Sequence, residues 1–140
     1  MKTFESNSAE ETMEIGKLIA SETKSGDVYA LIGDLGVGKT AFSQGFAKGL
    51  GIKSPVASPT FTILMEYDEG RIPLHHFDVY RIADPMELEE IGFDDCIYSD
   101  GATLIEWADL IREELPQNTT YVRIEKDLEK GFDYRKITIE

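Results

Sequence analysis

The chain has 140 residues, and its 14 Lys and Arg against 27 Asp and Glu give a formal net charge of −13. Its length favours one domain over residues 1–140, and its 41% hydrophobic and 10% aromatic residues exclude a disordered acidic tail. The charge argues against a protein that holds nucleic acid by itself, because phosphate binding needs a surface rich in Lys and Arg.

Cysteine content and hydropathy indicate the compartment. The single cysteine, Cys96, excludes an internal disulfide and a metal site built from several cysteines. No apolar run approaches the roughly 20 residues that span a bilayer. The first residues, MKTFESNSAEE, lack the apolar stretch of a signal peptide. We therefore expect a soluble, cytoplasmic protein with no membrane partner.

The first third of the chain alternates strand and helix patterns. Residues 2–6 predict a short edge strand, and Ser8 with Glu11 forms a capping box that starts a helix. The apolar run 27–32 predicts a buried strand, and a glycine-rich turn leads from it to a helix over 39–50.

The remainder of the chain predicts further strands with short helices between them. In chain order we expect a loop at 54–59, a hairpin of strands 61–67 and 72–80, a short acidic helix at 85–91, a buried strand at 102–105, a helix at 107–115 and closing strands at 120–124 and 135–139. Strands that alternate with helices predict an α/β layer fold. Because hairpin and crossover connections both occur, the sheet should be mixed and partly parallel.

Residues 33–40, GDLGVGKT, match the whole phosphate-loop pattern G-x-x-x-x-G-K-[ST]. Glycines let backbone N–H groups approach a phosphate without a Cβ in the way, and the N-terminus of the following helix adds its positive end. Lys39 would reach the β- and γ-phosphates, and the Thr40 hydroxyl would bind Mg²⁺. The sequence therefore predicts a nucleoside-triphosphate site in a P-loop NTPase-like three-layer fold, with the loop residues Gly33, Asp34, Leu35, Gly36, Val37, Gly38, Lys39 and Thr40.

A phosphate loop also needs a carboxylate on the metal side and a group that places the attacking nucleophile. Glu106 follows the apolar strand 102–105 and occupies that kind of position, although a strand-end carboxylate facing water is the alternative. Asp78 ends another apolar stretch, and an ion pair with Arg81 is its ordinary interpretation. Thr60 lies in a Ser-Pro-Thr segment that resembles a switch loop, whose hydroxyl can complete a Mg²⁺ shell.

Two segments that the sequence lacks indicate which nucleobase the site binds and which reaction the bound nucleotide undergoes. It has no Asn-Lys-x-Asp segment of the kind that reads guanine, so adenine is favoured. It also lacks the long lid with which small-molecule phosphoryl-transfer enzymes exclude water. Slow ATP hydrolysis used as a switch is our leading interpretation. A small-molecule P-loop kinase and a nucleotide-gated adaptor are the alternatives.

Most of the negative charge lies between Asp84 and Glu114. Eleven acidic residues in this stretch are opposed only by Arg112, which gives −10 of the total of −13. Solvated helix faces and a patch that docks a basic partner explain such a run equally well.

Four sequence blocks together carry a family resemblance: GDLGVGKT, SPTFTILMEY at 58–67, HFDVYRIADPMELEEIGF at 76–93 and LIEWADLI at 104–111. The first block is common to phosphate loops in general. The other three, in this order and spacing, are specific. The chain resembles the bacterial TsaE (YjeE) family from its first helix to about Pro116.

The resemblance implies an ATPase of tRNA threonylcarbamoyladenosine biosynthesis that uses ATP and Mg²⁺ and leaves ADP. The family works with TsaD and TsaB, which transfer a threonylcarbamoyl group to an adenosine beside the anticodon. The TsaE-like subunit is expected to reset that complex between turnovers and not to perform the transfer. TsaD-like and TsaB-like partners would then hold the tRNA, in keeping with the acidic balance of this chain.

The resemblance also assigns residues. It implies an ATP loop at 33–40 that continues to Ala41, Mg²⁺ ligands at Thr40 and Glu106, and Thr12 near the adenine. The residues that it places in the catalytic part are Asp78, Glu106, Thr60 and Trp107.

Other features carry less weight by sequence alone. Without the resemblance, Trp107 is interpreted as ordinary packing. His75, His76 and Cys96 are interpreted as packing or strand-surface residues and not as ligands. Ala108 stands where the family often has proline, which leaves the start of the next helix open.

Overall fold

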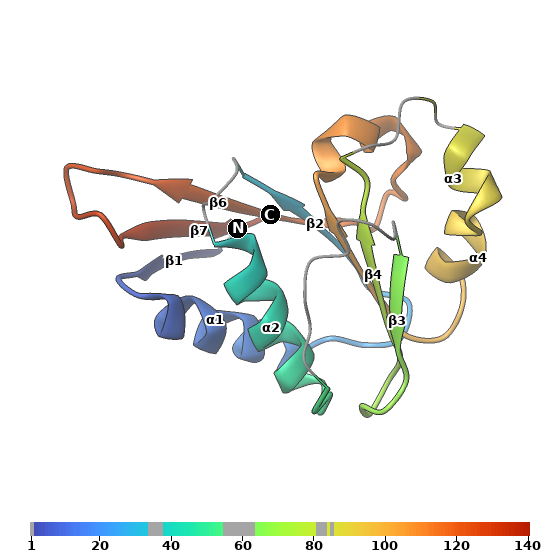
Figure 1. Ribbon diagram of the computed structural model, residues 1–140, viewed down its shortest axis with the longest axis horizontal. Coiled ribbons are helices and arrows are strands. Elements are labelled where there is room, and N and C mark those ends of the chain that lie inside the picture. Colours follow the sequence, from blue (N-terminus) through green and yellow to red (C-terminus); the bar gives the residue numbers. More distant parts are fainter. Residues whose placement is uncertain (1, 34–37, 55–63, 81–83, 85) are drawn as a thin grey trace.

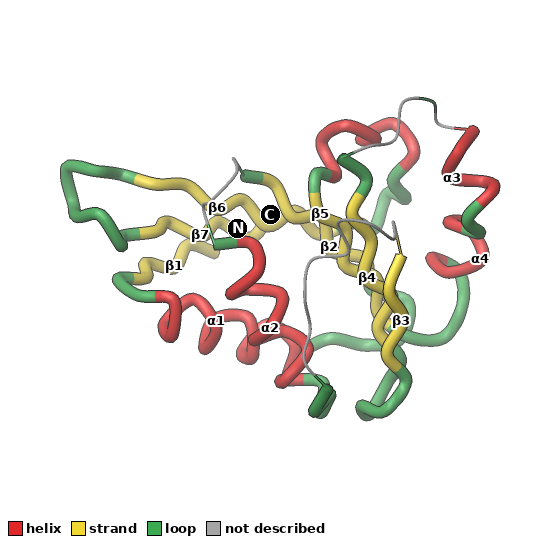
Figure 2. Tube along the Cα trace, viewed as in Figure 1, coloured by secondary structure: helices red, strands yellow, loops and turns green. Residues whose placement is uncertain are grey.

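The computed structural model describes residues 2–33, 38–54, 64–80, 84 and 86–140 (Figure 2). Its elements are β1 (Lys2–Ser6), α1 (Ala9–Ser21), β2 (Val28–Ile32), α2 (Lys39–Gly49), β3 (Leu64–Tyr67), β4 (Leu74–Asp78), α3 (Met86–Glu90), α4 (Phe93–Ile97), β5 (Ala102–Glu106), the 3₁₀ helix η1 (Ala108–Glu114), β6 (Thr120–Lys126) and β7 (Arg135–Ile139). The predicted loop residues 34–37, the switch-loop segment with Thr60, and Arg81 lie outside the described residues.

The described strands form one mixed sheet in the order β1-β7-β6-β2-β5-β4-β3. Its centre, β6-β2-β5-β4, is parallel, and β7 with β1 on one side and β3 on the other add antiparallel pairs. All five residues of β2, β4 and β5 are buried, as parallel strands covered on both faces should be. The predicted mixed, partly parallel sheet is confirmed.

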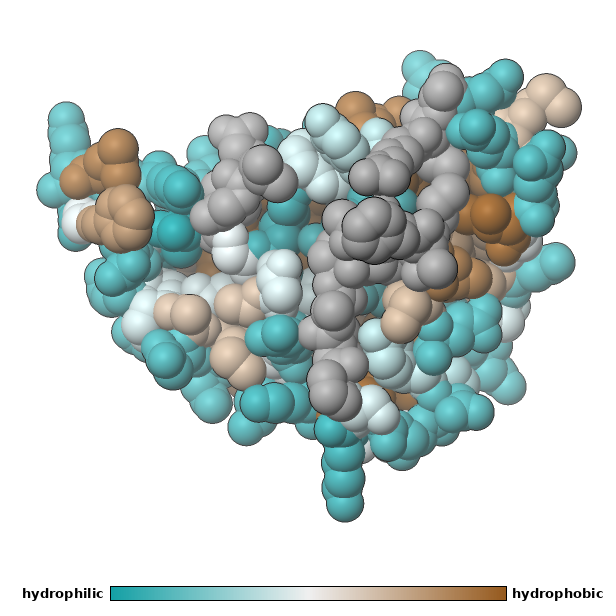
Figure 3. Space-filling model, viewed as in Figure 1, coloured by the Kyte–Doolittle hydropathy of each residue, from teal (hydrophilic) through white to brown (hydrophobic). Residues whose placement is uncertain are grey.

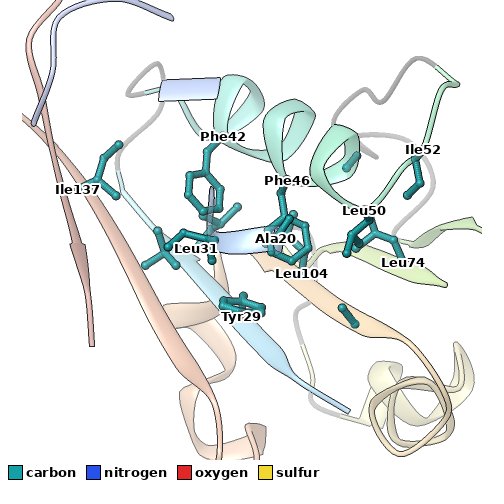
Figure 4. Close-up of a cluster of buried hydrophobic side chains, with 14 of the residues drawn as sticks. Ala20, Tyr29, Leu31, Phe42, Phe46, Leu50, Ile52, Leu74, Leu104 and Ile137 are labelled. Atoms are coloured by element: carbon teal, nitrogen blue, oxygen red, sulfur yellow. The ribbon is translucent and has the colours of Figure 1, made fainter. Parts of the chain in front are cut away.

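Helices cover the two faces of the sheet, with α1 and α2 on one and α3, α4 and η1 on the other (Figure 1). Alternate residues of β2 divide between them: Tyr29 and Leu31 join the core under α2, whereas Val28 and Ala30 join the core that contains α4. Figure 4 shows the first core, where helix residues such as Phe42 meet the strand side chains. The α/β three-layer prediction therefore holds.

Helices α1 and α2 approach each other closely because glycines face the contact. A Cβ at Gly45 would overlap the carbonyl oxygen of Met13, and a Cβ at Gly16 would overlap that of Phe42. Helix α1 starts as the capping box predicts, since the Ser8 hydroxyl accepts a hydrogen bond from the Glu11 N–H at 3.1 Å. The position of α1 is thereby fixed relative to α2.

The segment between β4 and β6 differs from its prediction in two places. A second short helix, α4, follows α3 where none was expected, because five residues are too few to show helical periodicity. The predicted helix at 107–115 is a 3₁₀ helix that starts at Ala108 and is kinked at Ile111. Trp107 precedes it with a positive φ of 62°.

The visible face of the molecule is largely hydrophilic, in keeping with its charge (Figure 3). An exception is the turn between β6 and β7, where Leu128 and Phe132 are strongly exposed. Among the described residues no helix is both long and apolar enough to cross a membrane.

Candidate functional site

The site is organised where β2, in the middle of the parallel sheet, ends and α2 begins. Ile32 is the last residue of β2, and α2 starts at Lys39 directly after Gly38. Gly38 has a φ of 102°, a conformation that glycine adopts at little cost. Ligands of open α/β sheets bind outside the carboxyl ends of the strands. The predicted phosphate loop therefore has its required strand and helix, although 34–37 lie outside the described residues.

Lys39 is buried at the start of α2. Its Nζ donates a hydrogen bond to the carbonyl oxygen of Gly33 at 2.9 Å. The same Nζ lies 3.4 Å from the centroid of the Trp107 ring, which is a cation–π contact. Thr40, the next residue, is exposed. The ammonium group thus lies between the end of β2 and the residue that follows β5.

Two carboxylates end neighbouring strands at this edge. Asp78 and Glu106 are register partners on the parallel strands β4 and β5, and β5 also pairs with β2. Both side chains are buried. The Glu106 Oε2 lies 2.7 Å from Nε2 of His76, whose side chain is fully buried. Since Glu106 is buried and hydrogen-bonded, the alternative of a carboxylate facing water is wrong.

The backbone after β4 is held against the same edge. The Tyr80 N–H donates to Oδ1 of Asp78 at 3.0 Å, and the Val79 N–H donates to the Glu106 carbonyl at 3.2 Å. The Tyr80 and Trp107 rings have centroids 4.8 Å apart. Trp107 therefore contacts both Lys39 and the segment after Asp78, and it also packs against the hydrophobic core on the α4 side, as its packing interpretation predicts.

A cavity of about 100 Å³ lies beside Gly38. Its lining residues come from both ends of the chain and from α2: Ser8, Ala9, Thr12, Gly38, Ala41, Asp133 and Arg135. The Thr12 and Ser6 hydroxyls are hydrogen-bonded to each other at 2.8 Å, which holds Thr12 in place. Thr12 and Ala41, both assigned by resemblance, are thus brought together beside the start of α2.

The structure brings most of the predicted site residues that it describes to one edge of the sheet. Lys39, Asp78, Glu106 and Trp107 form one group, and Thr12, Gly38 and Ala41 form the adjoining one. Sequence reasoning missed four residues at this edge, namely His76, Tyr80, Asp133 and Arg135. His76 was interpreted as packing, but its contact with Glu106 places it in the site.

The donor set at this edge fits a hard cation. The Thr40 hydroxyl and the Glu106 carboxylate offer oxygen atoms, the ligand type that Mg²⁺ prefers. Asp78 adds a second buried carboxylate in the neighbouring register position. The residues present therefore offer the oxygen ligands that suit a Mg²⁺ ion.

The family model for "Threonylcarbamoyl adenosine biosynthesis protein TsaE" matches residues 6–137. This chain belongs to the TsaE family. A protein of Bacillus subtilis named tRNA threonylcarbamoyladenosine biosynthesis protein TsaE is 51% identical over 129 residues, which cover 92% of this chain and 78% of the relative. A protein of the same name from Treponema pallidum is 40% identical, with 85% of this chain and 87% of that one covered.

The fold agrees with a solved structure of the same group. The crystal structure of YdiB from Bacillus subtilis superposes with a TM-score of 0.84 at 43% sequence identity, over 99% of this chain and 83% of that one. The predicted family and fold class are therefore confirmed. Membership of the TsaE family makes this a nucleotide-binding protein of tRNA threonylcarbamoyladenosine biosynthesis.

Proposed function

We propose that this TsaE protein is a Mg²⁺-dependent ATPase that hydrolyses ATP slowly and acts on a complex of TsaB-like and TsaD-like proteins. In this role it is required for the threonylcarbamoyl modification of tRNA beside the anticodon but does not transfer the group. The proposal takes residues 1–140 as one P-loop ATPase domain. The observation that carries it is the meeting of Lys39 and the Glu106–Trp107 strand end at one edge of the parallel sheet.

Lys39 supplies the positive charge for the β- and γ-phosphates. Its Nζ donates a hydrogen bond to the Gly33 carbonyl and lies over the Trp107 ring, so the ammonium group lies between the end of β2 and the residue after β5. The start of α2 adds the positive end of the helix dipole on the same side. Residues 33–40 are therefore assigned to the phosphates, with their backbone N–H groups as donors.

Thr40 and Glu106 are the residues that would hold Mg²⁺. When bound, the ion neutralises charge that develops on the phosphate oxygens. His76 contacts Glu106 at 2.7 Å and keeps that carboxylate oriented. Asp78 lies beside Glu106 in the register and is assigned to the attacking water, which it would orient by accepting a hydrogen bond from it.

Two further assignments complete the site. The cavity beside Gly38 is assigned to the adenine, because Thr12 and Ala41 line it next to the phosphate loop. The Asp133 carboxylate on the same wall can accept a hydrogen bond from the exocyclic amino group of adenine, which guanine lacks at that position. Thr60 is assigned to a switch loop that responds to the γ-phosphate.

The charge of the chain supports an indirect role toward tRNA. A net charge of −13 disfavours direct contact with the phosphate backbone. Hydrolysis would instead be read by protein partners that hold the tRNA. Such a role is consistent with a slow ATPase that depends on its partners for stimulation.

ATP hydrolysis by the purified chain, alone and with a TsaB–TsaD pair and tRNA, tests the proposal. We expect little turnover alone and clear stimulation by the pair. Lys39→Met should weaken ATP binding at least tenfold, whereas Lys48→Met, an exposed lysine on the same helix, should leave binding unchanged. Glu106→Gln should keep ATP binding and lower stimulated turnover about a hundredfold.

Three results would contradict parts of this assignment. A rate of ATP hydrolysis that the TsaB–TsaD pair does not change would refute the proposed role toward these partners. Rapid transfer of phosphate to an added metabolite would favour a small-molecule kinase. Equal ATP affinity of the wild type and Lys39→Met would refute the phosphate site itself.

A further inference from the structure

Three side chains of metal-binding type meet on the face of the sheet covered by α4. Glu66 on β3, His75 on β4 and Cys96 on α4 each place one ligand atom within 4.8 Å of the other two. Glu66 and His75 are register partners in the β3–β4 hairpin, and cross-strand partners point to the same face. We propose that these three residues form a binding site for a thiophilic divalent ion, with Zn²⁺ as the best match.

The distances are close to those of a tetrahedral site. Glu66 Oε1 lies 3.7 Å from Cys96 Sγ and 3.9 Å from His75 Nδ1. Zinc bonds of about 2.0 Å to nitrogen or oxygen and about 2.3 Å to sulfur place neighbouring tetrahedral ligands about 3.3–3.6 Å apart. An ion among the three groups therefore requires the distance from Glu66 to Cys96 to shorten by about 0.2 Å and the distance from Glu66 to His75 to shorten by about 0.6 Å.

The hydrogen bonds of His75 leave one ring nitrogen for the ion. His75 Nε2 lies 3.1 Å from the Asp100 carbonyl oxygen and 3.1 Å from the Ser99 hydroxyl. Because a carbonyl only accepts, Nε2 carries the proton, and Nδ1 of the neutral ring keeps its lone pair. His75 is only 8% exposed, and its Nδ1 makes no hydrogen bond within the described part of the chain.

This arrangement of His75 matches the pattern of a metal-ligating histidine. Such a ring usually donates its other N–H to a backbone carbonyl or carboxylate, which fixes the tautomer and the ring orientation. The Asp100 carbonyl has that position here. A simple ion pair with Glu66 fits less well, because 3.9 Å from Nδ1 to Oε1 is too long for a hydrogen bond.

The ligand chemistry selects the ion. A thiolate, a carboxylate and a neutral imidazole carry two negative charges, which balance a divalent cation. Sulfur and nitrogen ligands favour zinc over magnesium or calcium, which prefer oxygen. Binding replaces the thiol proton of Cys96, which passes to solvent, and three protein ligands leave a fourth position for water.

The proposed metal site is separate from the edge of the sheet where Lys39, Asp78 and Glu106 lie. His75 precedes Asp78 by three residues on β4, about 10 Å along the strand. It also shares its face with Phe77, which packs against Phe93 of α4, whereas Asp78 points to the opposite face. An ion at this place would join α4 to the β3–β4 hairpin, elements that lie side by side in Figure 1.

Cobalt titration of the nucleotide-free protein under reducing conditions tests the site. A thiolate bound to Co²⁺ gives a near-ultraviolet charge-transfer band, and Cys96 is the only cysteine in the sequence, so the band reports this site alone. We expect the band to saturate at one equivalent and to disappear when Zn²⁺ is added. The midpoint temperature of thermal unfolding should rise when Zn²⁺ is added and should stop rising at one equivalent.

Variants separate the site from unspecific binding. Cys96→Ser should abolish the band and the thermal shift, and Glu66→Gln, on an exposed side chain that tolerates exchange, should weaken Co²⁺ binding at least tenfold. Asp94→Asn removes an exposed carboxylate from the same helix and should change neither readout by more than twofold. No charge-transfer band in the wild type, or Zn²⁺ affinity unchanged in both ligand variants, would overturn the proposal.

Discussion

The ammonium group of Lys39 lies 3.4 Å from the centroid of the Trp107 ring, so the first residue of α2 contacts the residue that follows β5. Among the described residues, Trp107 is the one non-glycine with a positive φ. Bulky residues adopt this left-handed conformation at a cost of about 1–2 kcal/mol. A strained backbone thus holds the Trp107 ring over Lys39. A substitution of Trp107 therefore changes the free energy of unfolding in two ways, by removing the contacts of the ring and by changing the backbone strain.

Substitutions of Trp107 should show this strain directly. Glycine adopts a φ of 62° freely, so Trp107→Gly should unfold with a free energy about 1 kcal/mol higher than Trp107→Ala. In an ordinary helix or strand the order is the reverse. Urea unfolding of both variants measures the difference, and a less stable glycine variant would contradict the strain.

His76 should matter more than an ordinary core residue. It is fully buried, and its Nε2 lies 2.7 Å from Glu106 Oε2. Replacing it with alanine removes a hydrogen-bond partner from a buried carboxylate, which should lower the free energy of unfolding by about 1–3 kcal/mol. His76→Gln retains a hydrogen-bond donor, so its free energy of unfolding should fall by less than that of His76→Ala. Equal losses for the two variants, measured by urea unfolding, would show that only side-chain volume matters.

The nucleobase assignment predicts a change in selectivity through Asp133. Asp133→Asn adds an amide donor to a wall that has a carboxylate, so the preference for ATP over GTP should fall about tenfold or more. Asp127→Asn, in the same β6–β7 connection but outside the cavity, is the matched control. Competition binding with the two nucleotides and Mg²⁺ measures the ratio, and an unchanged ratio would remove Asp133 from base recognition.

Cys96 should react slowly with alkylating reagents. Burial, with the nearby Glu66 carboxylate as the next cause, raises the pKa of the Cys96 thiol from 9.0 to about 11. The thiolate is the reactive form, so its fraction in the folded protein below pH 9 is roughly a hundredfold lower than in the unfolded chain. Iodoacetamide labelling should keep accelerating up to about pH 11 in the native protein. In denaturant the rate should level off near pH 9.

Glu66→Gln provides the control for this pKa. It removes the negative charge that disfavours the thiolate, so the pKa of Cys96 should fall and labelling at pH 8 should become faster. A labelling profile that is the same in native and denatured protein would contradict the raised pKa.

The contact between α1 and α2 should not tolerate a side chain at Gly45. A Cβ there would overlap the Met13 carbonyl oxygen, which is backbone and cannot turn away. Although alanine favours helices, Gly45→Ala should lower the free energy of unfolding by about 3 kcal/mol. Lys48→Ala, on the exposed side of α2, should change it by less than about 0.5 kcal/mol. Thermal or urea unfolding distinguishes the two.

The sequence was most informative where one local rule decides the structure. The Ser8 cap, the buried strand before Gly33 and the start of α2 at Lys39 each depend on a few adjacent residues, and all three were predicted. Glu106 could be placed at the site because parallel strands end at the same edge.

What the sequence could not predict depends on pairing between distant segments. The contact of His76 with Glu106 requires the register of β4 on β5, and Asp133 and Gly38 line one cavity because β7 pairs with β1, the strand that leads into α1. The 3₁₀ geometry of η1 likewise follows from tertiary packing and not from residue pattern.

The cavity beside Gly38 has a consequence for the synthesis of the chain. Its wall joins Ser8 and Thr12 to Asp133 and Arg135, which are synthesised much later than these two. A nascent chain can fold α1, β2 and α2 and still have this cavity open on one side. The cavity therefore cannot close before Asp133 and Arg135 have been synthesised, and a chain truncated before Asp133 would be without that wall.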